Sequence, residues 1–262
     1  MGVINGLKSL FALFTVIPIK GGEFSEEVAR YLPLTPVVGA VYGVLAGLLL
    51  VGLEFVLPPF PSAAIMLLAV YLLNGFFHVD GLIDFGDGIA AFGDKQKKLQ
   101  AMKDTKVGAG GVILALLVTL ATVSLYSNIP LAQLFVSVFS VEILCKNSLL
   151  ACATFGKPHE SGLGKLFVER MGEKKLLVSS LISLALVTTA ILIYVYLLDL
   201  SVAYELEIFL LASPLISIIA GASLALSANK LFGCVTGDVL GASHELSRLI
   251  ILALTIMVIF IA

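Results

Sequence analysis

The chain has 262 residues, of which 59% are hydrophobic and only 13% are charged. Its mean hydropathy of +1.08 lies far above that of soluble domains, so the composition indicates an integral membrane protein. The formal net charge of −2 excludes the basic signature of a nucleic-acid-binding protein, and an odd count of three cysteines favours free thiols over a disulfide framework.

Apolar stretches along the chain predict an all-α fold, a polytopic membrane helix bundle that forms a single integral membrane domain over residues 1–262. Residues 1–18 hold an apolar run that is short for a span, so an interfacial or re-entrant helix is expected there. Transmembrane helices, about seven in all, are expected at residues 34–57, 61–79, 107–127, 131–155, 176–198, 205–228 and 246–262.

Lysines and arginines concentrate in alternate connections, which indicates how the bundle is oriented. They precede the first span and recur in residues 80–106, 156–175 and 229–245. None occurs in the connections at residues 58–60, 128–130 and 199–204. Because cytoplasmic loops hold an excess of these residues, the first group and the N-terminus are expected inside and the C-terminus outside. The sequence therefore predicts a multi-pass plasma-membrane protein whose long polar loops face the cytoplasm.

An acidic motif follows the second expected span. Asp80, Asp84 and Asp87 are spaced by four and three residues, so they share one face if the preceding helix continues. Three carboxylates on one face repel each other unless a cation lies among them, and such hard oxygen ligands favour Mg²⁺, Mn²⁺ or Ca²⁺ over zinc. Interleaved glycines, Gly81 and Gly88 among them, leave room for a bulky phosphorylated group. The alternative for any single carboxylate is a role in capping the helix end.

Basic residues follow the motif and suit phosphate binding. Asp104 adds a fourth carboxylate among them. His78 points to nearly the opposite side of a helix from Asp80, so it is expected to be either a proton carrier or a packing residue. Metal and lysines together favour phosphoryl chemistry. The lysines of this stretch are Lys95, Lys97, Lys98, Lys103 and Lys106.

Two later connections carry further candidate residues. The loop at residues 155–164 has glycines and a lysine that could hold an anionic group. In residues 232–245, Asp238 and Glu245 stand seven positions apart, which predicts a second acidic site at the same membrane surface. The alternative is that Thr236 caps a helix and Asp238 favours its positive end. His244 is expected to lie in a loop or an interface.

Polar side chains also occur within the apolar spans. Glu142 and Lys146 stand four residues apart and are expected to neutralise each other on one helix face. Intramembrane charges are costly, so this pair is either functional or a structural ion pair of the bundle interior. Asn74, Gln133 and Asn147 are expected to form hydrogen bonds between helices.

Four motifs occur in order along most of the chain: HVDGLIDFGDG, MKDTKVGAGG, GLGKLF and TGDVLGASHEL. Together they resemble the cobalamin synthase family, also called the adenosylcobinamide-GDP ribazoletransferases. Two segments depart from the family's pattern, because Val16 stands where an arginine is common and Lys157-Pro158-His159 replaces a Tyr-Ala-Arg-like stretch. The matching positions are His78, Asp80, Gly81, Asp84, Asp87, Gly88, Asp104, Gly108, Gly162, Gly164, Thr236, Gly237 and Asp238.

The resemblance implies the last step of cobamide assembly, in which α-ribazole or its 5′-phosphate displaces GMP from adenosylcobinamide-GDP. It implies Mg²⁺ as the cofactor, which would bridge the diphosphate and offset transition-state charge. The expected metal ligands are Asp80, Asp84 and Asp87. The expected substrate-binding residues are Gly81, Gly88, Lys103, Lys106, Lys157, Gly162, Gly164 and Asp238.

The incoming hydroxyl also needs a proton acceptor. We expect Asp104 in this role, because the adjacent Lys103 would keep its carboxylate ionised; a fourth metal ligand is the alternative. His78 is the second candidate for proton transfer. The expected partners are the two small-molecule substrates and the lipid bilayer, with a homo-oligomer left open and no nucleic acid.

Two other functions fit parts of the same pattern. A CDP-alcohol phosphotransferase would perform the same reaction on a lipid acceptor, but Ile83 and Asp84 stand where that family has Ala-Arg. A cation-coupled transporter would use the intramembrane carboxylates as ion ligands, yet the paired broken helices and inverted repeats of such proteins are not seen in the sequence.

Overall fold

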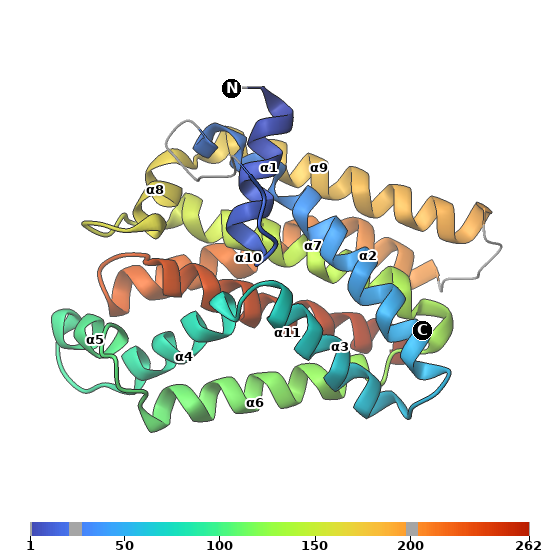
Figure 1. Cartoon of the computed structure of the whole chain (residues 1–262), viewed down its shortest axis with the longest axis horizontal. Coiled ribbons are helices and arrows are strands. Elements are labelled where there is room, and N and C mark those ends of the chain that lie inside the picture. The colour runs from blue at the N-terminus through green and yellow to red at the C-terminus, as the bar shows by residue number, and fades with distance from the viewer. Residues whose placement is uncertain (1, 21–27, 198–203, 262) are drawn as a thin grey trace.

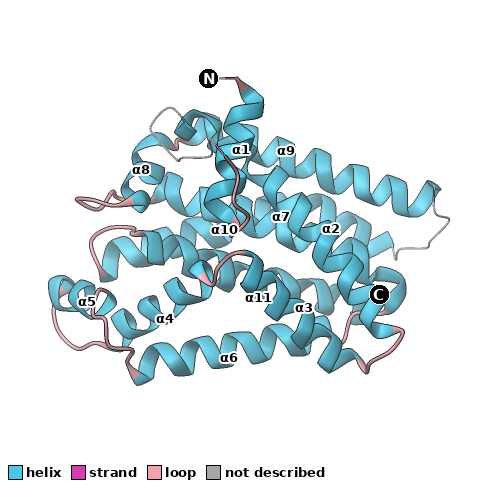
Figure 2. Cartoon of the chain, viewed as in Figure 1, coloured by secondary structure: helices cyan, strands magenta, loops and turns pink. Residues whose placement is uncertain are grey.

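The computed structural model describes residues 2–20, 28–197 and 204–261, and it contains helices and no strand within these ranges (Figures 1 and 2). Among the described residues, six helices are long and apolar enough to cross a membrane, or seven crossings if a bent helix pair counts as one. The expected all-α polytopic bundle is confirmed. The long helices are α2 (Thr35–Glu54), α6 (Ala109–Tyr126), α7 (Leu131–Phe155), α9 (Glu173–Leu192), α10 (Tyr204–Leu231) and α11 (Gly237–Ile261).

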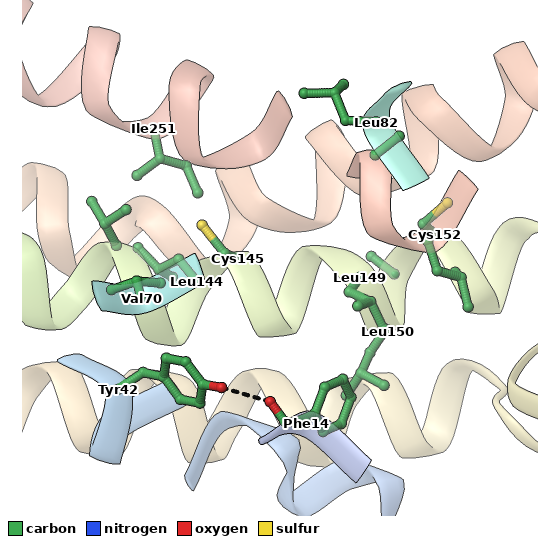
Figure 3. Close-up of a cluster of buried hydrophobic side chains, with 14 of the residues drawn as sticks. Phe14, Tyr42, Val70, Leu82, Leu144, Cys145, Leu149, Leu150, Cys152 and Ile251 are labelled. Carbon is green, nitrogen blue, oxygen red and sulfur yellow. Dashed lines mark hydrogen bonds between the residues drawn. The ribbon is translucent and has the colours of Figure 1, made fainter. Parts of the chain in front are cut away.

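Helix α7 is the centre of the bundle. Its apolar stretch is 94% buried inside the protein, and the helix packs against α2, α9, α10 and α11. Small residues allow this close packing: a Cβ on Gly43 of α2 would lie 2.7 Å from the Phe139 Cα of α7. Side chains of α7 such as Leu144, Cys145 and Leu149 form the middle of the core (Figure 3).

The N-terminal helix α1 (Val3–Phe14) is short and apolar, and it lies across the long helices rather than beside them (Figure 1). It packs against the 3₁₀ helix η1 (Val28–Leu34) and α2. At its end, the Tyr42 hydroxyl of α2 donates a hydrogen bond of 2.5 Å to the Phe14 carbonyl (Figure 3). The expected short helix is therefore present, and its last residue reaches the core.

The second expected span, residues 61–79, does not run straight into the acidic motif. Helix α3 (Pro59–Leu73) ends at Asn74, and α4 (Phe77–Ala90) begins after a bend of 94°. Gly75 (φ 65°) and Phe76 (φ 62°) are both left-handed, which no α-helix can continue. The prediction of one continuous helix was wrong, but Asp80, Asp84 and Asp87 still lie on a single helix because all three fall within α4.

The polar connections gather at one end of the bundle. Figure 1 shows the C-terminal end of α4, the short helices α5 (Lys95–Met102) and α8 (Leu163–Arg170), and the start of α11 at that end, whereas the α2–α3 turn and the end of α11 lie at the other. The expected grouping of residues 80–106, 156–175 and 229–245 on one side is confirmed. The last span begins earlier than expected, at Gly237 rather than residue 246, so residues 237–245 are helical.

Candidate active site

Two glycines bring α4 and α11 into close contact. A Cβ on Gly81 would lie 2.8 Å from the Asp238 carbonyl oxygen, and a Cβ on Gly241 would lie 3.2 Å from the His78 Cα. Only glycine fits at the first of these positions without moving backbone. This crossing brings Asp238, far away in the sequence, to the acidic motif of α4.

The resulting cluster has four carboxylates from two helices. Asp84 is partly buried, and Asp80, Asp87 and Asp238 all interact with it electrostatically. No three His, Cys, Asp or Glu side chains in the described ranges converge as a preformed metal cage. Mg²⁺ needs no such cage, because it is usually bound by one or two carboxylates, water and the phosphates of a substrate. The donor chemistry of the cluster therefore fits Mg²⁺ brought in with a phosphorylated substrate.

Asp87 has a structural role that the spacing did not reveal. Its carboxylate accepts backbone hydrogen bonds of 2.7 Å from Gly108 and of 2.7 Å from Gly111, at the N-terminal end of α6. The bonds satisfy two amides that a helix end leaves unpaired, and they tie α4 to α6. Each oxygen keeps a second lone pair. The role of Asp87 as a metal ligand thus stays a prediction.

Asp238 is oriented by the start of α11. The Thr236 hydroxyl accepts a 3.3 Å hydrogen bond from the Val239 amide and lies 3.1 Å from an Asp238 carboxylate oxygen, to which it donates. The alternative that Thr236 caps a helix is confirmed. Gly164 of α8 packs against the Thr236–Gly237 backbone so closely that any larger residue would clash. The GLGKLF and TGDVLGA motifs therefore meet at this helix start.

A cavity of about 440 Å³ opens beside this cluster. Its polar lining comes from Asn74, His78, Asp80 and Asp238. His78 is buried and Asp80 is exposed, as expected for residues on different sides of α4, and both contribute to the lining of this cavity. Its other walls are apolar or glycine and come from α1, α4, α7, α8 and α11: Ala12, Leu13, Phe14, Phe77, Leu149, Leu163, Gly164, Phe167, Gly237, Leu240 and Gly241.

His78 links the cavity to charged groups of the bundle interior. It is buried, and its Nε2 lies 2.8 Å from the Lys146 Nζ. Its ring stacks on His244 at a centroid distance of 4.1 Å. His244 is buried within α11, so its expected place in a loop or interface was wrong.

The interior charges pair differently from the sequence expectation. Arg248 of α11 donates to both Glu142 carboxylate oxygens, each at 3.1 Å, and also to Glu245. Among the residues that the structure describes, no ion pair joins Glu142 to Lys146, so the expected mutual neutralisation was wrong. Glu245 is only 1% exposed, so it does not form a second acidic surface site with Asp238. Sequence reasoning missed Arg248 as the partner of Glu142, although an arginine inside the expected span at residues 246–262 was a usable signal.

The three amide side chains within the spans differ from one another in their hydrogen bonding. Asn147 forms the expected interhelical bonds, with Ser217 at 2.8 Å and with Ser179 at 2.8 Å. Gln133 Oε1 and both polar atoms of Asn74 are buried without a hydrogen-bond partner within the described part of the chain. The prediction was right for Asn147 alone.

The remaining candidates lie on exposed segments around the cluster. Lys103 Nζ is 2.9 Å from His159 Nε2, and Lys103 interacts electrostatically with Asp238. Asp104 lies on an exposed turn, where it accepts a 3.0 Å hydrogen bond from the Lys106 amide, and it is absent from the described lining of the cavity.

Lys106 and Lys157 are exposed, and Gly162 (φ 93°) precedes α8. Their roles in binding or proton transfer stay predictions, as does that of Gly88, which packs against Met102.

Comparison with known proteins places these motifs in one family. The profile of the family described as cobalamin-5-phosphate synthase matches residues 6–256. An adenosylcobinamide-GDP ribazoletransferase of Methanocella arvoryzae is 31% identical over 94% of this chain and 93% of its own length. A protein of the same name from Methanosarcina mazei is 30% identical over 95% of this chain and 91% of its own length. One from Clostridium botulinum is 28% identical over 97% of this chain and 98% of its own length.

No solved structure matches the chain. The family match extends over all four motifs, from the acidic residues of α4 to the start of α11. The resemblance seen in the motifs is thereby confirmed, and the chain belongs to the cobalamin-5-phosphate synthase family.

Proposed function

We propose that this protein catalyses the last step of cobamide assembly, in which α-ribazole or its 5′-phosphate displaces GMP from adenosylcobinamide-GDP. The family match and the names of the relatives support this substrate pair over the CDP-alcohol phosphotransferase and the transporter. The structural observation that carries the proposal is the meeting of Asp80, Asp84 and Asp238 beside a cavity. Carboxylates that meet beside a cavity suit metal-assisted chemistry on a diphosphate.

In the proposed reaction, a ribose hydroxyl oxygen bonds to the phosphorus that carries the cobinamide. The bond from that phosphorus to the oxygen of GMP breaks, and the hydroxyl proton passes to a base. Mg²⁺ bound to the diphosphate would offset charge as the bond to GMP breaks. Asp80, Asp84 and Asp238, with Asp87 alongside, are the side chains that would hold it. Asp104 is the base suggested by the sequence, but its exposed turn away from the described cavity lining favours another proton acceptor.

The lysines around the cluster suit the phosphates of the donor. Lys103 is the lysine whose charge acts on Asp238, and it borders a second cavity of about 530 Å³ together with His159 and Lys95. We infer that the guanosine diphosphate part of the donor lies along this basic rim, where ammonium groups stabilise phosphate oxygens. Lys106 and Lys157 extend the basic surface.

We infer that this end of the bundle faces the cytoplasm at the plasma membrane. The connections at this end hold nearly all loop lysines and arginines, and cytoplasmic loops are enriched in both. Single-cysteine variants in a background without Cys145, Cys152 and Cys234 test the orientation in sealed vesicles. In sealed right-side-out vesicles, a cysteine at position 97 should react with a membrane-impermeant reagent only after the vesicles are made permeable. Labelling from the outside alone would reverse the topology.

The reaction itself is tested with purified protein in detergent. With Mg²⁺, adenosylcobinamide-GDP and α-ribazole, the protein should release GMP and form adenosylcobalamin, and a chelator should stop the release. The same protein is then given a CDP-alcohol and a lipid acceptor. Release of CMP in the second assay with none of GMP in the first would move the assignment to a CDP-alcohol phosphotransferase.

A further inference from the structure

The side-chain amide of Asn74 is buried without a hydrogen-bond partner among the described residues. Its side chain is 1% exposed, and within the described residues neither Oδ1 nor Nδ2 has a hydrogen-bond partner. The residue ends α3 at the 94° bend and lines the cavity beside the acidic cluster. Asn147, the comparable amide of α7, is instead fully bonded to serines of α9 and α10.

Such an amide is costly to bury. A buried donor or acceptor that has lost its water and gained no partner destabilises the fold by about 1–3 kcal/mol. A hydrophobic residue of similar size would avoid that cost in the apolar surroundings of Phe14, Phe77 and Leu149. A polar molecule that reached the amide from the cavity and offered one donor and one acceptor would satisfy it.

The cavity limits which of the two substrates this is. Its volume of about 440 Å³ is in the range of a nucleoside-sized ligand, whereas the corrin macrocycle with its side chains is far larger. The aromatic rings of Phe14, Phe77 and Phe167 line it, and flat aromatic bases pack well against such rings. Asp80 is exposed, whereas Asn74 is buried, so the carboxylates lie on the open side and the amide lies deeper.

We propose that this cavity binds the acceptor nucleoside, with its aromatic base among the three phenylalanines, the Asn74 Nδ2 donating to the free ring nitrogen of the base and the Asn74 Oδ1 accepting from a ribose hydroxyl. This assignment rests on the proposed function. The acceptor then lies between the bundle interior and the carboxylates, with a ribose hydroxyl turned toward Asp80 and Asp238, and the corrinoid donor approaches from the open side. Asn74 acts by binding and positioning the acceptor.

The test separates acceptor binding from turnover. Affinity for α-ribazole alone is measured by titration calorimetry on the detergent-solubilised protein, and KM values for acceptor and donor are measured from GMP release. Asn74→Leu should weaken α-ribazole binding about tenfold or more and raise the acceptor KM to match, with the donor KM unchanged. Its melting temperature without ligand should not fall, since no protein hydrogen bond is lost. Asn74→Ser provides a smaller, polar change at the same site.

Asn147→Ser is the matched control. It removes bonds to three serines, so the melting temperature should fall while α-ribazole affinity stays the same. Unchanged α-ribazole affinity in both Asn74 variants, or a rise in the donor KM in place of the acceptor KM, would overturn the assignment. Wild-type protein that binds α-ribazole through Asn74 but releases no GMP would defeat the proposed function and leave the binding site standing.

Discussion

Helix α11 carries two groups of charges whose surroundings are opposite. At its start, Asp238 joins the carboxylates of α4 around a cavity, where these acids repel one another and only the exposed side of the cluster carries lysines such as Lys103. Two turns further on, Glu245 and Arg248 are buried and bonded to each other, and Arg248 is also bonded to Glu142. The first group is left open to a ligand, and the second is closed by the protein itself.

The difference teaches how to separate functional from structural charges in a membrane bundle. In the interior, Arg248 is bonded to both Glu142 and Glu245, and Tyr71 donates a further hydrogen bond of 3.1 Å to Glu245. Buried charges are tolerated when each is paired and hydrogen-bonded. The acidic cluster differs, because Asp80 is exposed and the cluster borders a cavity, which in the proposed reaction leaves its negative charge to Mg²⁺ and the diphosphate.

The largest effect is expected on stability when the interior group loses its arginine. Arg248→Met leaves Glu142 and Glu245 buried without their cation, which should lower the free energy of unfolding by about 3–5 kcal/mol. Thermal unfolding of the purified protein in detergent measures the loss. The control is Lys165→Met, which breaks an exposed 3.7 Å pair with Glu169 and should cost about 0–1 kcal/mol. Equal melting temperatures for the two variants would contradict the structural role of the interior group.

A substitution in the acidic cluster should lower activity and leave stability unchanged. Asp84→Asn keeps the size of the side chain but removes charge, so we expect GMP release to fall about 100-fold or more, with the melting temperature kept. The control is Asp94→Asn at the N-cap of α5, where asparagine caps as well as aspartate. Steady-state rates over a range of Mg²⁺ concentrations provide the measurement. Unchanged turnover and Mg²⁺ dependence in the Asp84 variant would remove the metal assignment.

The contact between the two helices can be tested at its closest point. In Gly81→Ala, the new methyl group would lie 2.8 Å from the Asp238 carbonyl oxygen, so α4 and α11 must move apart. We expect a loss of about 1–3 kcal/mol of stability, together with lower activity as Asp238 shifts. Gly52→Ala, at an exposed position of α2 with nothing within 4 Å, should be neutral or stabilising by about 0.5–1 kcal/mol. Full activity of the Gly81 variant would show that the spacing of the helices does not matter.

The smallest effect is expected at Asp104. A general base contributes about 10²- to 10⁴-fold, but Asp104 lies on an exposed turn, away from the described lining of the cavity. Asparagine can still accept the bond from the Lys106 amide, so Asp104→Asn should fold normally and lose less than about tenfold in GMP release. A loss of two orders of magnitude or more would instead establish Asp104 as the proton acceptor.

By itself, the sequence determined the membrane class, most helix positions and the acidic motif, because hydropathy and spacing are local properties that survive without a fold. Only the tertiary structure decided the partners. Glu142 and Arg248 are 106 positions apart, and Asp238 reaches Asp84 only because Gly81 lets two helices touch. The bend after Asn74 depends on two left-handed residues, one of them the non-glycine Phe76, which neither hydropathy nor helical spacing reveals. The same holds for the amide of Asn74, since whether a buried polar group is paired depends on which helices surround it.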